Sequence, residues 1–173
     1  MIEVITKYTK ESVKKYYRFH MLKKRVVSKI CLAILIICGF FLLFLSLFTD
    51  DSSPVIIGIA SIILAASPFY FPAINTNILY KKSPAVFDTG STIHFLEDHF
   101  SITMAGEYQS GTNDIKYEAL VNVYEIRDFF YLYIQPNMAY IVDKSDFTQG
   151  SPEELSQLFA QVLPGKKFCR YKK

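Results

Sequence analysis

The sequence contains no tryptophan and only three cysteines in 173 residues. Cys31 and Cys38 lie seven residues apart within an apolar run, and Cys169 lies alone near the end of the chain. They form no CxxC pair and have no histidine at metal-ligand spacing, which argues against both a disulfide framework and a zinc site. We therefore expect the three side chains to be small apolar residues in a reducing compartment.

Motifs for catalysis and for nucleotide binding are also missing. There is no glycine-rich phosphate loop, and no serine, threonine or cysteine stands in a nucleophile motif. The formal net charge is only +3, and acidic residues outnumber basic ones in residues 75–173, unlike the basic surface of a nucleic-acid-binding domain. The sequence thus predicts no cofactor, no catalysis and no nucleic-acid partner.

Charge is absent from two long apolar runs, residues 30–48 and residues 54–74, which are separated only by residues 49–53. As a helix the first run would extend about 28 Å, close to the hydrocarbon thickness of a bilayer. The alternatives fit less well, because a buried hairpin needs a larger surrounding domain and a secretory signal needs a small-residue cleavage site. We therefore predict a hairpin of two transmembrane helices. Without ionisable residues in either run, a transporter or channel is disfavoured.

The distribution of basic residues predicts the orientation of this hairpin. Residues 1–29 are rich in lysine and arginine, Lys81 and Lys82 follow the second run, and the connecting loop contains Asp50 and Asp51 but no base. Basic residues are retained on the cytoplasmic side. We therefore expect a multi-pass protein of the cell (inner) membrane with both termini in the cytoplasm.

Small residues and prolines stand out in the second run. Gly58, Ser61 and Ala65 lie on one helical face, which favours close packing within the hairpin, with dimerisation through that face as the alternative. Pro68 and Pro72 lack a backbone N–H, so they should kink or end the helix. We therefore expect a helix that packs closely on its neighbour and is interrupted near these prolines.

The N-terminal segment predicts a short strand at residues 2–5, followed by a helix that begins at Lys10 with Thr9 as its N-cap. The helix has an aromatic side and a basic side, and such a helix beside a span lies at the level of the lipid headgroups. The C-terminal tail, residues 166–173, is basic as well. The side chains expected to contact anionic headgroups are Lys14, Lys15, Arg18, Lys23, Lys24, Arg25, Lys166, Lys167 and Arg170.

Residues 85–165 read as a small antiparallel β domain closed by one helix. Ser151-Pro152-Glu153-Glu154 combines an N-cap, a proline at the first helical position and a capping-box glutamate. The fold class is therefore a membrane α-helical hairpin joined to an α+β domain, which we compare with a pleckstrin-homology-like (PH-like) fold by analogy. Alternating apolar residues between turn signals predict strands at 85–87, 92–96, 100–104, 112–117, 120–126, 129–134 and 139–143.

The best candidate for chemistry is the segment from His94 to His99. If Glu97-Asp98 is the loop of a hairpin, His94 opposes Ser101, and the two histidines are diagonal neighbours on the face away from the core. A divalent metal could then bridge them, with Asp98 or Glu97 as a further ligand. The competing interpretation, which we favour, is an exposed polar hairpin tip, because no second ligand cluster is present.

Other polar and aromatic residues of the β domain have simpler interpretations. Glu118, Glu125 and Asp128 are scattered among apolar residues, as expected for a solvated sheet face. Tyr131 and Tyr133 alternate along an aromatic strand. They would form a patch for a protein partner if the second face of that sheet stays exposed.

Several segments together resemble the YcxB-like family of bacterial membrane proteins. They are Lys7-Tyr8-Thr9-Lys10-Glu11, Phe19-His20 in the following helix, and residues 117–125, 129–134 and 139–147. The resemblance covers nearly the whole chain and implies a bacterial inner-membrane protein with a C-terminal YcxB-like domain. It implies no particular activity.

From these observations we expect a membrane-anchored cytoplasmic binding or scaffolding module in contact with the bilayer and with a protein partner. One alternative is a membrane-bound metal-dependent enzyme or ligand sensor that uses the hairpin of His94 and His99. Another is an accessory or immunity subunit for a membrane partner. Copurified metal in the isolated protein would favour the first alternative.

Overall fold

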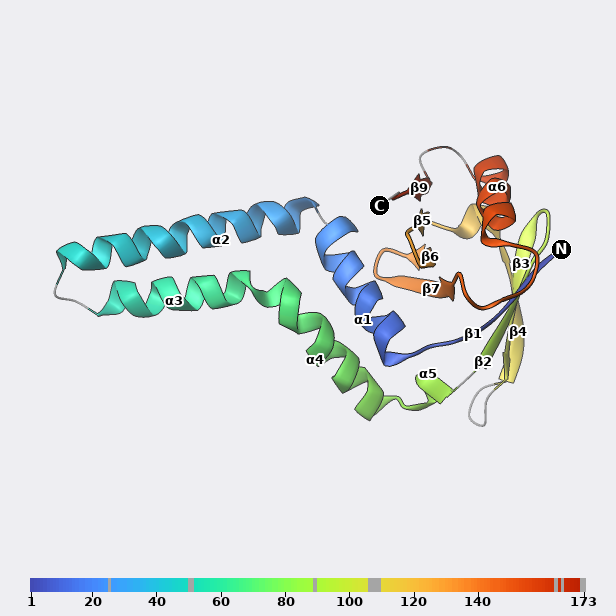
Figure 1. Cartoon of the computed structure of the whole chain (residues 1–173), viewed down its shortest axis with the longest axis horizontal. Helices are drawn as coiled ribbons and strands as arrows, with labels where there is room; N and C mark the ends of the chain where they lie inside the picture. Colours follow the sequence, from blue (N-terminus) through green and yellow to red (C-terminus); the bar gives the residue numbers. More distant parts are fainter. Residues whose placement is uncertain are drawn as a thin grey trace. The chain divides into compact units, whose positions relative to one another are not determined.

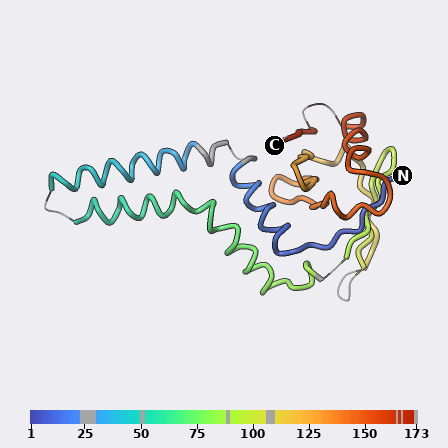
Figure 2. Tube along the Cα trace, in the orientation of Figure 1, coloured from blue at the N-terminus to red at the C-terminus, as the bar shows by residue number. Residues whose placement is uncertain are grey.

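The computed structural model describes residues 1–24, 26–49, 52–88, 90–105, 110–163, 165 and 167–171. The chain divides into two compact units. One contains Met1–Val13 and Leu79–Lys173, and the other contains Lys14–Ile78 (Figures 1 and 2). The first holds all the strands and the second holds most of the helical hairpin.

The N-terminal helix is capped as predicted. Helix α1 spans Lys10–Phe19, and the backbone N–H of Ser12 donates to Thr9 Oγ1 at 3.1 Å while the Thr9 N–H donates to Ser12 Oγ at 3.0 Å. This reciprocal pair satisfies two backbone donors at the helix start. A π-helical turn, His20–Lys24, follows α1.

Two helices of the second unit, α2 (Val26–Leu45) and α3 (Ser53–Ala65), lie side by side as a hairpin (Figure 1). They meet at two glycines. A Cβ atom on Gly58 would lie 3.0 Å from the carbonyl oxygen of Gly39, and one on Gly39 would lie 2.9 Å from the Ile62 side chain. Gly58 and Ala65 are buried, so the predicted packing of this face within the hairpin is confirmed.

The predicted second span is not one straight helix. Residues Ile30–Phe48 are long and apolar enough to cross a membrane, with a short 3-10 turn (Ser46–Phe48) at their end. Residues Ser53–Ala65 and Ser67–Lys82 (α4) reach that length only as a pair, bent by 61°. The break at Ala66 lies two residues before Pro68, which cannot donate a backbone hydrogen bond, so the predicted interruption is confirmed there. Pro72 lies inside α4, which continues to Lys82, so the helix does not end at Pro72 as predicted. The structure therefore gives one apolar helix of spanning length and one bent pair among the described residues.

The first unit contains two open sheets. The five-stranded sheet has the order β4-β3-β2-β1-β8 and the four-stranded sheet has the order β7-β6-β5-β9. Among the described strands the pairings are antiparallel, except the parallel pair of β5 with β9. The strands are β1 (Ile2–Lys7), β2 (Gly90–Phe95), β3 (His99–Ala105), β4 (Ser110–Lys116), β5 (Asn122–Glu125), β6 (Phe129–Gln135), β7 (Met138–Asp143), β8 (Phe147–Gln149) and β9 (Phe168–Arg170).

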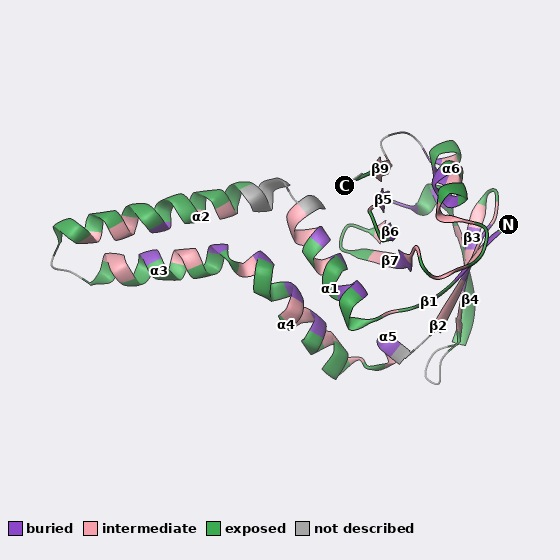
Figure 3. Cartoon of the chain, viewed as in Figure 1, coloured by how far each residue is buried: buried purple, intermediate pink, exposed green. Residues whose placement is uncertain are grey.

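Helix α6 (Pro152–Val162) completes the core of this unit. Its N-cap Ser151 accepts a hydrogen bond from the Glu154 N–H at 3.1 Å, as the capping motif predicts. Leu155 and Phe159 are fully buried, and the Phe159 ring lies 5.8 to 6.1 Å from aromatic rings of both sheets and of the turn between them. Figure 3 shows the buried face of α6 and, by contrast, the largely exposed surface of α2 and α3.

Six of the seven strands predicted for residues 85–165 are present, and the segment 85–87 is the exception. It belongs to a short helix, α5 (Ala85–Asp88), whose first turn closes through a hydrogen bond from the Phe87 N–H to the Pro84 carbonyl. A 3-10 turn, Tyr117–Ala119, separates β4 from β5. The predicted boundaries of the β domain, residues 85–165, exclude β1 and β9, which are strands of its two sheets. The domain is thus α+β with two sheets rather than one.

Candidate functional site

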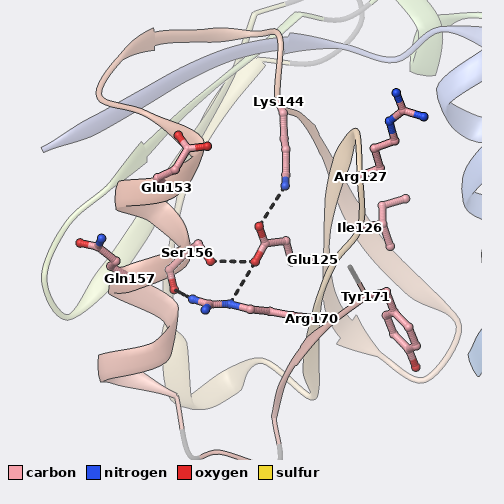
Figure 4. A pocket seen from close by; sticks show the side chains of 9 residues that line it. All are labelled: Glu125, Ile126, Arg127, Lys144, Glu153, Ser156, Gln157, Arg170 and Tyr171. Atoms are coloured by element: carbon pink, nitrogen blue, oxygen red, sulfur yellow. Dashed lines mark hydrogen bonds and ion pairs between the residues drawn. The ribbon is translucent and has the colours of Figure 1, made fainter. Parts of the chain in front are cut away.

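A charged pocket lies where β5 and β9 end near helix α6. Its volume is about 330 Å³. Figure 4 shows the side chains of Lys144, Ser156 and Arg170, which converge on the carboxylate of Glu125, the last residue of β5. The lining residues are Glu125, Ile126, Arg127, Lys144, Glu153, Ser156, Gln157, Arg170 and Tyr171.

Glu125 binds three donors from three other segments. Its Oε1 accepts a hydrogen bond from Lys144 Nζ at 2.9 Å, and its Oε2 accepts one from Ser156 Oγ at 2.7 Å. The Arg170 Nε lies 3.2 Å from Oε2, and Arg170 Nη2 donates to the Ser156 carbonyl at 3.0 Å. The Glu125 side chain is 20% exposed. The site is thus a preformed ion-pair cluster.

Opposing effects set the protonation of Glu125. Burial by itself raises its pKa, but the hydrogen bonds from Ser156 and Lys144 and the charges of Lys144 and Arg170 together outweigh burial. The net pKa of Glu125 therefore lies below its ordinary value, and the carboxylate is ionised at neutral pH. A group held in this state is unsuited to act as a general base near pH 7.

The local sequence explains why Glu125 turns toward α6. Val123 lies in the core, so Glu125, two residues later on the same strand, follows it on that side at the rim of the sheet. The prediction that Glu125 lies on a solvated sheet face is wrong. The pocket was missed because Lys144, Ser156 and Arg170 are distant in sequence from Glu125 and no local pattern links them.

The register of the histidine hairpin is confirmed. Phe95 pairs with Phe100 and His94 with Ser101, and the Leu96 N–H donates to the His99 carbonyl at 3.0 Å. The predicted loop of residues 97–98 joins β2 to β3.

Each histidine has a different carboxylate partner. His94 Nδ1 lies 3.4 Å from Glu3 Oε2 on β1, whereas His99 Nδ1 lies 2.6 Å from Asp98 Oδ1. The hydrogen bond with His99 is the main cause that lowers the pKa of Asp98. Across the described parts of the chain, no group of three or more histidine, cysteine or acidic side chains is arranged to hold a metal.

A comparison with family models matches a region that contains most of the pocket and His99, but not His94. Residues 95–159 match the model of the YcxB-like protein family. The YcxB-like region runs from the end of β2 to helix α6, so it contains Glu125, Lys144 and Ser156 but not Arg170. Searches of curated proteins and of solved structures found no match to the chain.

The aromatic strand of the YcxB-like region does not expose its tyrosines. The side chains of Tyr131 and Tyr133 are both fully buried. Tyr131 stacks on Phe129 with ring centroids 6.0 Å apart, and Tyr133 contacts Tyr124 edge to face at 5.5 Å. The predicted partner patch at these two tyrosines is therefore wrong, because neither ring is accessible.

The predicted lipid-contacting residues lie in different environments. Lys14, Lys15 and Arg18 are exposed on α1, whereas the Lys167 ammonium donates to the Glu118 carbonyl at 3.0 Å. Arg170 is a member of the Glu125 cluster, yet its side chain is 43% exposed, so its contact with lipid headgroups stays a prediction. Four further predictions lie outside what the structure describes, namely the side chains of Lys23 and Lys24 and the residues Arg25 and Lys166. Asp50 and Asp51 lie outside the described residues as well.

Proposed function

We propose that this chain is a membrane-anchored binding module whose YcxB-like domain faces the cytoplasm. The apolar segment Ile30–Phe48 supports the anchor, because only 6% of its spanning window is buried within the chain. Ile37, Phe40 and Phe41 are each about 60% exposed, which is a surface suited to lipid.

In the proposed anchor, the bent pair of α3 and α4 crosses the membrane a second time. Exposed Lys14 and Lys15 precede α2, and exposed Lys81 and Lys82 end α4, so basic residues flank both ends of the hairpin. This charge pattern favours a cytoplasmic location for both flanks. The exposed basic side of α1 is then available to anionic lipid headgroups.

The pocket at Glu125 is the observation that carries the binding role. It is formed by β5, β9, α6 and the segment after β7, and three of its charged groups, Glu125, Lys144 and Arg170, are held in ion pairs. Preformed polar groups in a small cavity are typical of a ligand site. The two sheets and the closing helix α6 also support the comparison with a PH-like fold, which is an argument about architecture alone.

An enzyme or sensor at His94 and His99 has weaker support, because the two rings face different carboxylates. His99 Nδ1 lies at hydrogen-bond distance from Asp98, whereas His94 Nδ1 lies 3.4 Å from Glu3 without a hydrogen bond. We therefore place the binding role at the Glu125 pocket. A protein partner remains part of the proposal, with the buried tyrosine patch excluded as its site.

The proposal is tested by washing native membranes with alkaline carbonate and then capturing the full-length protein in neutral detergent. We expect the protein to stay in the washed membranes and to retain a bound molecule that Lys144→Met removes. Lys116→Met is the matched control, because Lys116 is an exposed lysine of the same unit outside the pocket. Release of the protein by carbonate would contradict the anchor, and an identical set of bound molecules in both variants would contradict the binding role.

A further inference from the structure

The pocket at Glu125 contains more hydrogen-bond donors than acceptors. Three basic side chains, Arg127, Lys144 and Arg170, line it with the two acidic side chains of Glu125 and Glu153. One positive charge is therefore in excess. Because the inner members are partly buried, this excess is less screened than that of an exposed surface patch.

The contacts within the cluster engage both oxygens of Glu125 but only some of the cationic N–H groups. Both oxygens of Glu125 are engaged, and Oε2 takes two partners. Within the described chain, Lys144 donates one hydrogen bond from its three ammonium N–H groups, and Arg170 donates one from its five guanidinium N–H groups and forms an ion pair through Nε. Their cationic groups also lie over the rings of Phe130 and Phe168, at 4.8 and 5.0 Å. A molecule that enters the pocket thus meets cationic donors whose carboxylate is already occupied.

The rim of the pocket adds a third cation. Arg127 is 84% exposed, and its Nε lies 3.9 Å from Asp128 Oδ1, which is a loose pairing. Its long side chain can therefore reorient toward a ligand at little cost. On the α6 side, Glu153 and Gln157 offer acceptor oxygens for hydroxyl groups.

We propose that this pocket binds an oxyanion, a phosphate or carboxylate group carried by a small polar compound, through Lys144, Arg170 and Arg127. The volume of about 330 Å³ is at the low end for small-molecule sites, which limits the compound to the size of a small metabolite or a lipid headgroup. Charge-assisted hydrogen bonds from lysine and arginine are the usual means of holding such groups. This inference rests on the proposed binding role and names its ligand class.

The test is calorimetric titration of the full-length protein in neutral detergent with pyrophosphate and, separately, with citrate. We expect saturable binding of at least one of these probes. Arg127→Ala should weaken it by about fivefold, as expected for an exposed charge, and Lys144→Met by about tenfold or more. Lys116→Ala, the control outside the pocket, should leave the affinity unchanged. Arg127 is largely exposed, so its variant should fold even if the Lys144 variant does not.

A second titration distinguishes the source of the oxyanion. The protein is reconstituted in nanodiscs of neutral lipid or of lipid with added phosphatidylglycerol, and the soluble probe is titrated again. Loss of probe binding only with phosphatidylglycerol would support a headgroup ligand, and unchanged binding would support a soluble one.

Absence of saturable binding to both probes would overturn the inference, as would equal weakening by Lys116→Ala and Arg127→Ala. Either result could occur in a protein that still resists carbonate extraction and retains a ligand dependent on Lys144. The inference can therefore fail while the proposed binding role holds.

Discussion

At the scale of single residues, Glu125 has the largest structural role that the sequence does not reveal. Its carboxylate connects β5 to α6, to β9 and to the segment after β7 through Ser156, Arg170 and Lys144. Hydrogen bonds to a charged group each contribute more to stability than those between neutral groups. The cluster therefore fixes the C-terminal strand against the rest of the domain.

We predict that Glu125→Gln lowers the stability of the domain by about 1 kcal/mol at pH 7. Because the folded-state pKa lies below the ordinary value of 4.5, the stabilising contribution is fully present above pH 4.5 and is lost as the pH falls through the folded-state pKa. The difference between wild type and variant should therefore shrink below pH 4.5.

Thermal unfolding in detergent, monitored by circular dichroism from pH 3 to pH 7, measures this difference. Glu153→Gln is the matched control, since Glu153 lines the same pocket and is exposed on the first turn of α6. A difference between wild type and Glu125→Gln that stays constant over the whole pH range would contradict the account.

At the scale of elements, the hairpin of α2 and α3 depends on close approach at Gly39 and Gly58. The carbonyl oxygen of each glycine lies within about 3 Å of where a Cβ on the other would be, at 3.0 and 3.1 Å. Backbone atoms cannot move aside without separating the helices. Small residues at such a crossing allow close packing, which is the main source of helix association in lipid.

Gly58→Leu should separate the helices and destabilise the hairpin by about 1–3 kcal/mol, the usual cost of overpacking. Ala60→Leu adds a similar volume at an exposed position of α3 and should have little effect. Thermal unfolding of the full-length protein in detergent compares the two variants. Equal destabilisation by both would show that the glycine contact is unimportant.

The helices and strands that the sequence predicts correctly are those with a strong local pattern of apolar residues or capping residues. Six strands of residues 85–165 and both capped helices depend on alternation and capping, which neighbouring residues encode. Strands β8 and β9 are only three residues long, and β9 pairs with β5 across more than 40 residues, so no local pattern marks them. Residues 85–87 were misassigned because so short an apolar run fits a strand or a helical turn equally well.

The candidate site also contains features that neighbouring residues encode and features that depend on residues distant in sequence. The hairpin register of His94 and His99 follows from a two-residue loop, which is local information. The Glu125 pocket arises only when four segments come together, and the burial of Tyr131 and Tyr133 depends on what covers both faces of a sheet. Sequence periodicity assigns residues to faces but does not tell whether a face is covered.

At the scale of the whole molecule, the chain combines an apolar hairpin with an α+β domain that contains the YcxB-like region and a charged pocket. The hairpin supplies surface suited to lipid, and the domain supplies preformed polar groups. In the proposed topology, the residues between α2 and α3 lie on one side of the membrane and the whole domain lies on the other.

Cysteine accessibility tests this requirement most directly. The three native cysteines are first replaced by alanine. Single cysteines are then introduced at three exposed positions, Ser52, Lys7 and Glu118. Intact spheroplasts that contain each variant are treated with a membrane-impermeant maleimide. We predict that Ser52→Cys reacts before permeabilisation, whereas Lys7→Cys and Glu118→Cys react only after it. Reaction of Glu118→Cys in intact spheroplasts, or protection of Ser52→Cys there, would contradict the membrane-anchored cytoplasmic module.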